Sequence, residues 1–209
     1  MSDYRKPVKM GFDRLEAVAE TSAAGSALDP AEVSALAHST AEALIYRDNV
    51  GDQEIVDRLV SFSDEFGLDT LASLWSDAHP ASLPGALWRL YLVRAALGQQ
   101  LEDSRVLFQE GIDQLDTIDE VIAGAPDPLD ATGFQEVLDD VLRGAFTGNL
   151  AHALDRAAAI ARAISAGSLH YSWIDDKAQQ SLTKRSLNWS VIAGELSTAA
   201  KKSRAAKLN

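Results

Sequence analysis

Apolar side chains recur with the period of an α-helix along most of this chain. The first strong start is Asp29-Pro30-Ala31-Glu32, where Asp29 can cap, Pro30 suits the first helical position and Glu32 completes a capping box. Val33, Leu36 and Leu44 then share one face. No stretch alternates strictly enough between apolar and polar residues to predict a strand.

Three helical hairpins of similar length follow from this pattern, at about 30–66, 84–123 and 129–166. Asn149 is predicted to cap the second helix of the last hairpin, and Gly167 to end it. A final helix would bury Trp189, Ile192, Leu196 and Ala199. The pattern predicts an all-α fold of about eight or nine helices in antiparallel hairpins, as a helical bundle or a short α-solenoid.

The helix predicted over 84–97 is apolar on nearly every side, which favours a central position surrounded by other helices. Its charged residues are Arg89 and Arg94. A buried arginine needs a partner, because an isolated charge in a core costs several kcal/mol. Either each arginine pairs with an internal acid, or the two form an anion-binding site with Trp88 or Tyr91 as a stacking wall.

Residues 124–128, Gly-Ala-Pro-Asp-Pro, are the strongest break in the chain. A length of 209 residues fits one domain, so we expect a single all-α domain over 1–209. The alternative is two subdomains that meet at 124–128.

Charge is unevenly distributed along the chain. The formal net charge is −12, yet residues 177–209 carry seven basic residues and one acid, while residues 15–176 carry 28 acids, 8 arginines and no lysine. The acidic part repels nucleic acid. The candidate polyanion contact is therefore the basic tail, 201–209, through Lys201, Lys202, Arg204 and Lys207. The other interpretation is a solubilising helix end, and in both cases we expect residues from about Lys201 onward to lie outside the core.

Composition excludes several classes of protein. The chain has no cysteine, which removes disulfides, thiol catalysis and cysteine metal sites. No apolar run is long enough to span a bilayer, and no apolar stretch follows the first basic residues as in a signal peptide. We therefore expect a cytoplasmic protein with no membrane contact. Phosphate-binding glycine loops and the Gly-x-Ser-x-Gly elbow are absent from the sequence.

Paired carboxylates are the one pattern that could carry metal chemistry. Glu110 and Asp113 stand three apart on one predicted helix, and Glu136 and Asp139 stand three apart on the next. Carboxylates at this spacing share a helix face and can hold Mg²⁺. Two such helices resemble the all-helical nucleoside-triphosphate pyrophosphohydrolases, and the resemblance implies metal binding by these four residues and a nucleotide substrate. Solvated helix faces explain the same pattern without metal or any other cofactor.

Two further resemblances concern the fold. The run Gly148-Asn149-Leu150, followed by Ala153-Leu154 and Ala157, resembles the second helix of a tetratricopeptide repeat, within the hairpin at 129–166. The first helix of that unit departs from the repeat pattern at Asp140 and Gly144. The segment over 82–91, Ser-Leu-Pro-Gly-Ala-Leu-Trp-Arg-Leu-Tyr, is similar to sequences in uncharacterised all-helical proteins of actinobacteria. This resemblance implies a fold class and no activity.

These patterns leave two hypotheses for function. The first is a non-enzymatic helical module that binds another protein or a second copy of itself. The alternative is a metal-dependent pyrophosphohydrolase-like enzyme that uses the paired carboxylates. The missing catalytic motifs favour the first.

Overall fold

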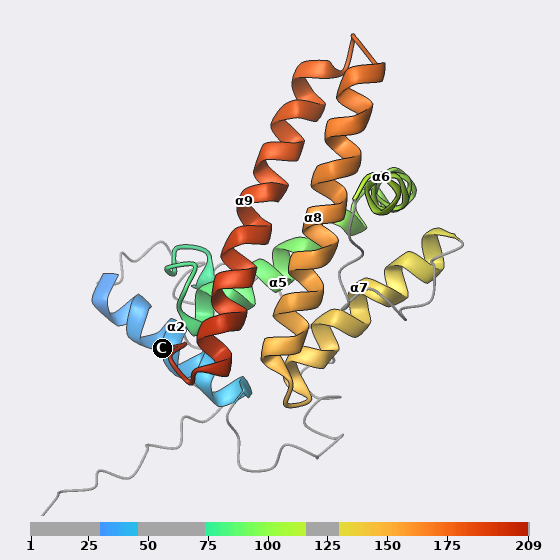
Figure 1. The fold of residues 1–209 in the computed structure, drawn as a ribbon. Coiled ribbons are helices and arrows are strands. Elements are labelled where there is room, and N and C mark those ends of the chain that lie inside the picture. Colours follow the sequence, from blue (N-terminus) through green and yellow to red (C-terminus); the bar gives the residue numbers. More distant parts are fainter. Residues whose placement is uncertain (1–29, 46–73, 116–129, 209) are drawn as a thin grey trace, which may run out of the picture.

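The structure is a computed structural model, and it describes residues 30–45, 74–115 and 130–208 (Figure 1). These residues contain helices and no strand, which confirms the all-α prediction. The described part holds six helices and does not confirm the predicted eight or nine. In chain order they are α2 (Pro30–Ile45), α5 (Leu83–Gly98), α6 (Leu101–Gln114), α7 (Ala131–Phe146), α8 (Leu150–Ile174) and α9 (Gln179–Arg204).

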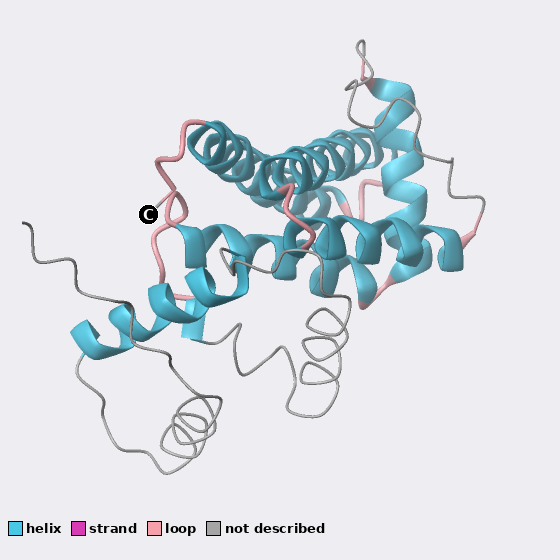
Figure 2. Ribbon diagram, turned by 90° about the horizontal axis from the view of Figure 1, so that it is seen from below, coloured by secondary structure: helices cyan, strands magenta, loops and turns pink. Residues whose placement is uncertain are grey.

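The two longest helices, α8 and α9, form an antiparallel hairpin with the most extensive helix–helix contact in the described chain. They lie side by side in both ribbon views (Figures 1 and 2). Alanine supplies much of the buried surface of α8, including Ala157, Ala161 and Ala163, each fully buried. Small side chains let neighbouring helix axes approach closely, so α8 can pack against α9, α6 and α7 together.

Glycine sets the crossing of α6 over α8. A Cβ placed on Gly111 would stand 1.7 Å from the backbone oxygen of Ala163, and one on Gly167 would stand 2.0 Å from that of Leu107. The two backbones therefore touch. Gly167 was predicted to end its helix, and that prediction is wrong, because α8 continues to Ile174. Gly167 therefore allows α6 and α8 to come into close contact and does not end its helix.

Helix α5 contacts each of the other five described helices, as expected for an apolar helix at the centre. Leu87, Leu90 and Val93 are buried on it, whereas Trp88 and Tyr91 are half-buried. Its start is fixed by Ser82, whose hydroxyl accepts a hydrogen bond from the Gly85 amide at 3.3 Å.

Side-chain caps also fix the starts of α7 and α8. The Asp130 carboxylate accepts from the Gly133 amide at 2.8 Å, and the Asn149 side chain accepts from the His152 amide at 3.2 Å, as predicted for Asn149. Gly148, with φ 97°, makes the turn between the two helices. The second helix of the first predicted hairpin and the break at 124–128 lie outside the described residues, so the division into subdomains stays a prediction.

The predicted buried face of α9 is confirmed at Trp189, Leu196 and Ala199. The expectation for the end of the chain is wrong in part. Leu208 is buried within the main core cluster, and α9 itself extends through Lys201 and Lys202 to Arg204. The chain turns back after α9 through Ala206, with φ 51°, which carries the leucine onto the core.

Candidate functional site

Both candidate anion-binding arginines have carboxylate partners. The Arg89 Nε donates to Glu195 of α9 at 2.5 Å, and its Nη1 donates to the Gly85 carbonyl oxygen at 3.1 Å. The Arg94 Nε donates to Asp139 of α7 at 2.8 Å. These are the internal ion pairs that the first interpretation of the two arginines requires.

Trp88 and Tyr91, each considered as a stacking wall for an anion, contact each other instead. The rings of Trp88 and Tyr91 stack on each other, with centroids 5.7 Å apart and planes at 27°. This contact lies within α5, whereas the ion pairs of Arg89 and Arg94 connect α5 to α9 and α7. The arginines and aromatic side chains of α5 that the sequence suggested for anion binding thus make contacts within the protein.

The four candidate metal ligands do not share one site. Glu110 lies 3.4 Å from His170 of α8 and accepts from Gln114, whereas Asp139 is bound to Arg94 of α5 and accepts from Gln135. Asp113 and Glu136 are exposed. Within the described ranges, no three histidine or acidic side chains gather as a metal site would require. The structure therefore does not bring the two carboxylate pairs together.

The basic residues of the candidate polyanion contact are partly engaged by the protein. Arg204 pairs with Asp155 of α8, and the Lys202 ammonium donates to the Ala81 carbonyl oxygen at 3.4 Å. Lys201 and Lys207 are exposed, and neither makes an ion pair with any described residue. This end of the chain thus lies against its own acidic body at two points.

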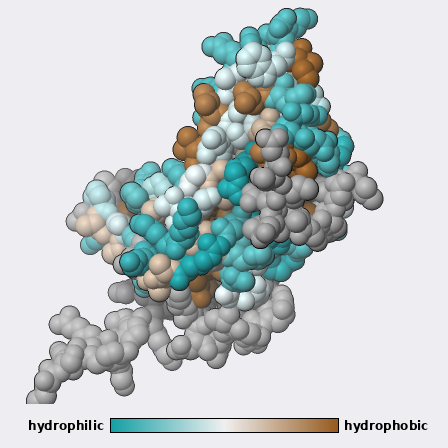
Figure 3. Space-filling model, in the orientation of Figure 1, coloured by the Kyte–Doolittle hydropathy of each residue, from teal (hydrophilic) through white to brown (hydrophobic). Residues whose placement is uncertain are grey.

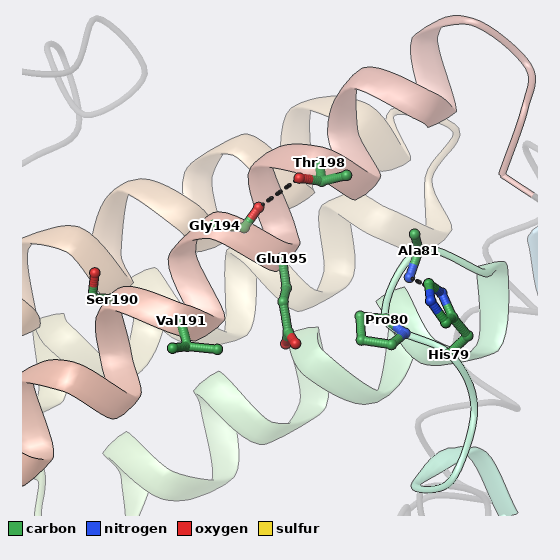
Figure 4. A pocket seen from close by; sticks show the side chains of 8 residues that line it. All are labelled: His79, Pro80, Ala81, Ser190, Val191, Gly194, Glu195 and Thr198. Atoms are coloured by element: carbon green, nitrogen blue, oxygen red, sulfur yellow. Dashed lines mark hydrogen bonds between the residues drawn. The ribbon is translucent and has the colours of Figure 1, made fainter.

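Figure 4 shows a groove between α9 and the segment that precedes α5. Its volume is about 530 Å³. It is lined by His79, Pro80 and Ala81 on one side and by Ser190, Val191, Gly194, Glu195 and Thr198 on the other. We call it the α9 groove. Gly194 exposes bare helix backbone in its wall, and a Cβ built there would meet no atom within 4 Å, so the space beside it is open.

Glu195 contributes little free negative charge to the α9 groove. Its carboxylate is held by Arg89, whose side chain is only 14% exposed. The Thr198 hydroxyl donates to the Gly194 carbonyl oxygen, and the His79 Nδ1 accepts from the Ala81 amide. Most of the groove lining is apolar, and these polar groups are already bound within the protein, so the groove can receive an apolar side chain beside Val191.

A set of large apolar side chains is exposed on the upper part of the α8–α9 hairpin, where Figure 3 shows several separate brown patches along these two helices. Trp173 is 77% exposed and Ile174 63% at the end of α8. We call the set the hairpin surface: Leu169, Trp173, Ile174, Leu187 and Val191. Val191 also lines the α9 groove, so the two features are continuous.

The helical spacing explains this surface. Leu169 and Trp173 are four apart on α8, and Leu187 and Val191 are four apart on α9, so each pair forms one ridge. The sequence held this signal: Leu187 and Val191 fall off the face that carries Trp189 and Leu196. It was missed because an apolar residue in an amphipathic helix is first assigned to the core.

Arg185 is a half-buried basic residue of α9. Burial lowers the pKa of the Arg185 guanidinium, and the nearby Asp103 carboxylate opposes that shift. Its Nη2 donates to Ser104 of α6 at 3.5 Å. An arginine keeps its proton at neutral pH, so this side chain connects α9 to α6 as a cation.

Comparison with protein-family models, with curated proteins and with solved structures found no match to this chain. Among the described helices, none combines the length and the apolar character that crossing a membrane requires. The function is accordingly inferred from this chain's own side chains.

Proposed function

We propose that this chain is a non-enzymatic helical interaction module, whose hairpin surface binds another protein or a second copy of the chain. The observation that supports the proposal is the exposure of five large apolar side chains on one projecting hairpin. Single exposed apolar residues are common on monomeric proteins, but several large ones on one hairpin are typical of a surface that binds a partner.

The chemistry of the hairpin surface fits protein recognition. Tryptophan is enriched among the residues that dominate binding energy at interfaces. An aromatic side chain buries roughly 150–250 Å² when covered, so Trp173, at 77% exposure, offers a large apolar area to a partner. The adjoining α9 groove supplies the concave part into which a partner side chain would fit.

The test compares proteins that co-purify with the tagged full-length chain from its native host. The variant is Trp173→Ser combined with Leu187→Ser, and the matched control is Val106→Ser on α6, since Val106 is also exposed, at 36%. All three side chains are exposed, so the fold should be retained, and circular dichroism checks that it is.

We expect the hairpin variant to lose at least one co-purifying protein, or the chain's own self-association, that the control retains. A hairpin variant that keeps every partner and the same oligomeric state as the wild type would overturn the proposal.

A further inference from the structure

The outer face of α9 carries an uncharged line of residues with a lysine at each end. Leu187, Val191, Gly194 and Thr198 are all exposed, and their spacing of four, three and four places them on one face. Lys184 lies one turn before this line and Lys201 one turn after it, so both continue the same face. We call these six residues the outer stripe.

The lysines of the outer stripe are available to a partner. Both are exposed, and within the described part of the chain neither forms an ion pair. The one acid of α9, Glu195, is held by Arg89. The nearest acids outside α9 along the chain are Asp175 and Asp176, in the turn that precedes its start. The stripe therefore presents an apolar centre between two positive ends.

From this pattern we infer that the outer stripe binds an amphipathic helix with acidic residues near both of its ends. This inference rests on the proposed function and specifies its partner. Apolar residues at a spacing of three and four on the partner would pack along Leu187 and Val191, as helices pack in grooves. A bulky side chain of the partner would pack over the bare backbone at Gly194, in the α9 groove.

Charge spacing sets the dimensions of the partner. Lys184 and Lys201 are seventeen residues apart, which corresponds to about 25 Å along a helix at 1.5 Å per residue. A partner helix of roughly eighteen residues would place one acid beside each lysine. Complementary charges at the rim of an interface fix the register and orientation of the two helices.

The same charges argue against a second copy of α9 as the occupant. Antiparallel pairing of two α9 helices on this face would set Val191 of each opposite Gly194 of the other, and Leu187 opposite Thr198. That alignment sets Lys184 of one copy opposite Lys201 of the other, at both ends. Parallel pairing sets each lysine opposite itself. Both arrangements oppose like charges, whereas an acidic helix neutralises them.

A nucleic acid is the other anionic partner to weigh. Nucleic-acid binding depends on several basic side chains that follow the phosphates. Here four uncharged residues separate the two lysines. Two of these four, Leu187 and Val191, are apolar and offer phosphates no charge or hydrogen bond. The outer stripe therefore fits a helix better than a nucleic acid.

Selection from a displayed library of eighteen-residue helical peptides tests the inference with the full-length chain as bait. Against the wild type, we expect enriched peptides to carry apolar residues at a spacing of three and four, with Asp or Glu toward both ends. Against a Lys184→Glu, Lys201→Glu double variant, we expect the end charges of the enriched peptides to change to Lys or Arg. The matched control is Lys177→Glu with Lys207→Glu, two exposed lysines off the stripe, which should leave the selected charge pattern unchanged.

Affinity gives the quantitative readout. We expect charge reversal at both lysines to weaken binding of an acid-ended peptide by at least about tenfold, because each reversal removes an attractive rim pair and puts a like charge in its place. Gly194→Leu should abolish binding while the fold is retained, because a Cβ at this position meets no neighbour.

Three results would overturn the inference: no enrichment beyond that against Gly194→Leu, enriched peptides without the acidic ends, or tighter binding of a DNA duplex than of the peptides that depends on Lys184 and Lys201. Each leaves the proposed function standing if the Trp173→Ser, Leu187→Ser variant still loses a co-purifying partner. Retention of every partner by that variant refutes the proposed function instead.

Discussion

Substituting Gly111 by alanine tests whether the crossing of α6 and α8 depends on backbone contact. The added methyl group would stand 1.7 Å from the Ala163 carbonyl oxygen and 2.9 Å from its Cα. These are backbone atoms, which no side-chain rotation can move. The two helices must therefore separate by more than an ångström, and the buried side chains beside the crossing, Leu107 and Phe108, lose contacts.

The magnitude follows from two opposing terms. Overpacking of a core costs about 1–3 kcal/mol, and occasionally more. Replacing glycine by alanine inside a helix raises the free energy of unfolding by about 0.5–1 kcal/mol. We expect a net loss of about 1–2 kcal/mol in the free energy of unfolding, which lowers Tm by about 2–8 °C for a chain of this size.

The assay is urea and thermal unfolding followed by circular dichroism at 222 nm. The matched control is Gly144→Ala on α7, where a Cβ would meet only the Ala153 Cβ, at an ordinary contact distance of 4.0 Å. The control should be as stable as the wild type or more stable by about 0.5–1 kcal/mol. A Gly111→Ala protein as stable as this control would refute the backbone-contact geometry.

Three other predictions follow from the structure. Leu208→Ala should lower the free energy of unfolding by about 2–3 kcal/mol, because Leu208 is buried in the core; unfolding in urea measures this, and an unchanged midpoint would place Leu208 in solvent. Glu195→Gln should cost about 1–3 kcal/mol by leaving the mostly buried Arg89 without its carboxylate, and Asp140→Asn, which breaks the exposed pair with Arg143, should cost less than about 1 kcal/mol; equal losses in the two variants would contradict the difference in burial. Mg²⁺ at millimolar concentration should leave Tm unchanged, because the four candidate ligands do not converge and so give the folded state no added affinity; a rise in Tm that Glu110→Gln removes would revive the carboxylate site.

Helical periodicity predicted the helices and their buried faces because both depend on local spacing. The cap at Asn149 and the buried positions Trp189 and Leu196 were read directly from the sequence. Gly167 was misread because a glycine can end a helix or admit a neighbouring backbone. Only the position of Leu107, sixty residues earlier, decides between these two roles.

Charge pairing was predictable in kind but not in partner. The sequence indicated that Arg89 and Arg94 need acidic partners. It did not indicate which acids, because Glu195 and Asp139 lie far away in sequence and are brought close only by helix packing. The same limit applies to the hairpin surface. Leu187 and Val191 have the composition of core residues, and their exposure follows from the absence of a described helix over that face of α9.

The projecting α8–α9 hairpin also has a consequence for hydrogen exchange. At its far end Trp173, Ile174 and residues 175–177 are exposed, so few buried contacts oppose fraying of the last turn of α8 and the first turn of α9. Amide protons there should exchange with solvent through local opening, whereas those beside Gly111 and Gly167 should exchange only when the whole protein unfolds. A bound partner would thus be detected as slowed exchange at the far end of the hairpin, with little change at the crossing.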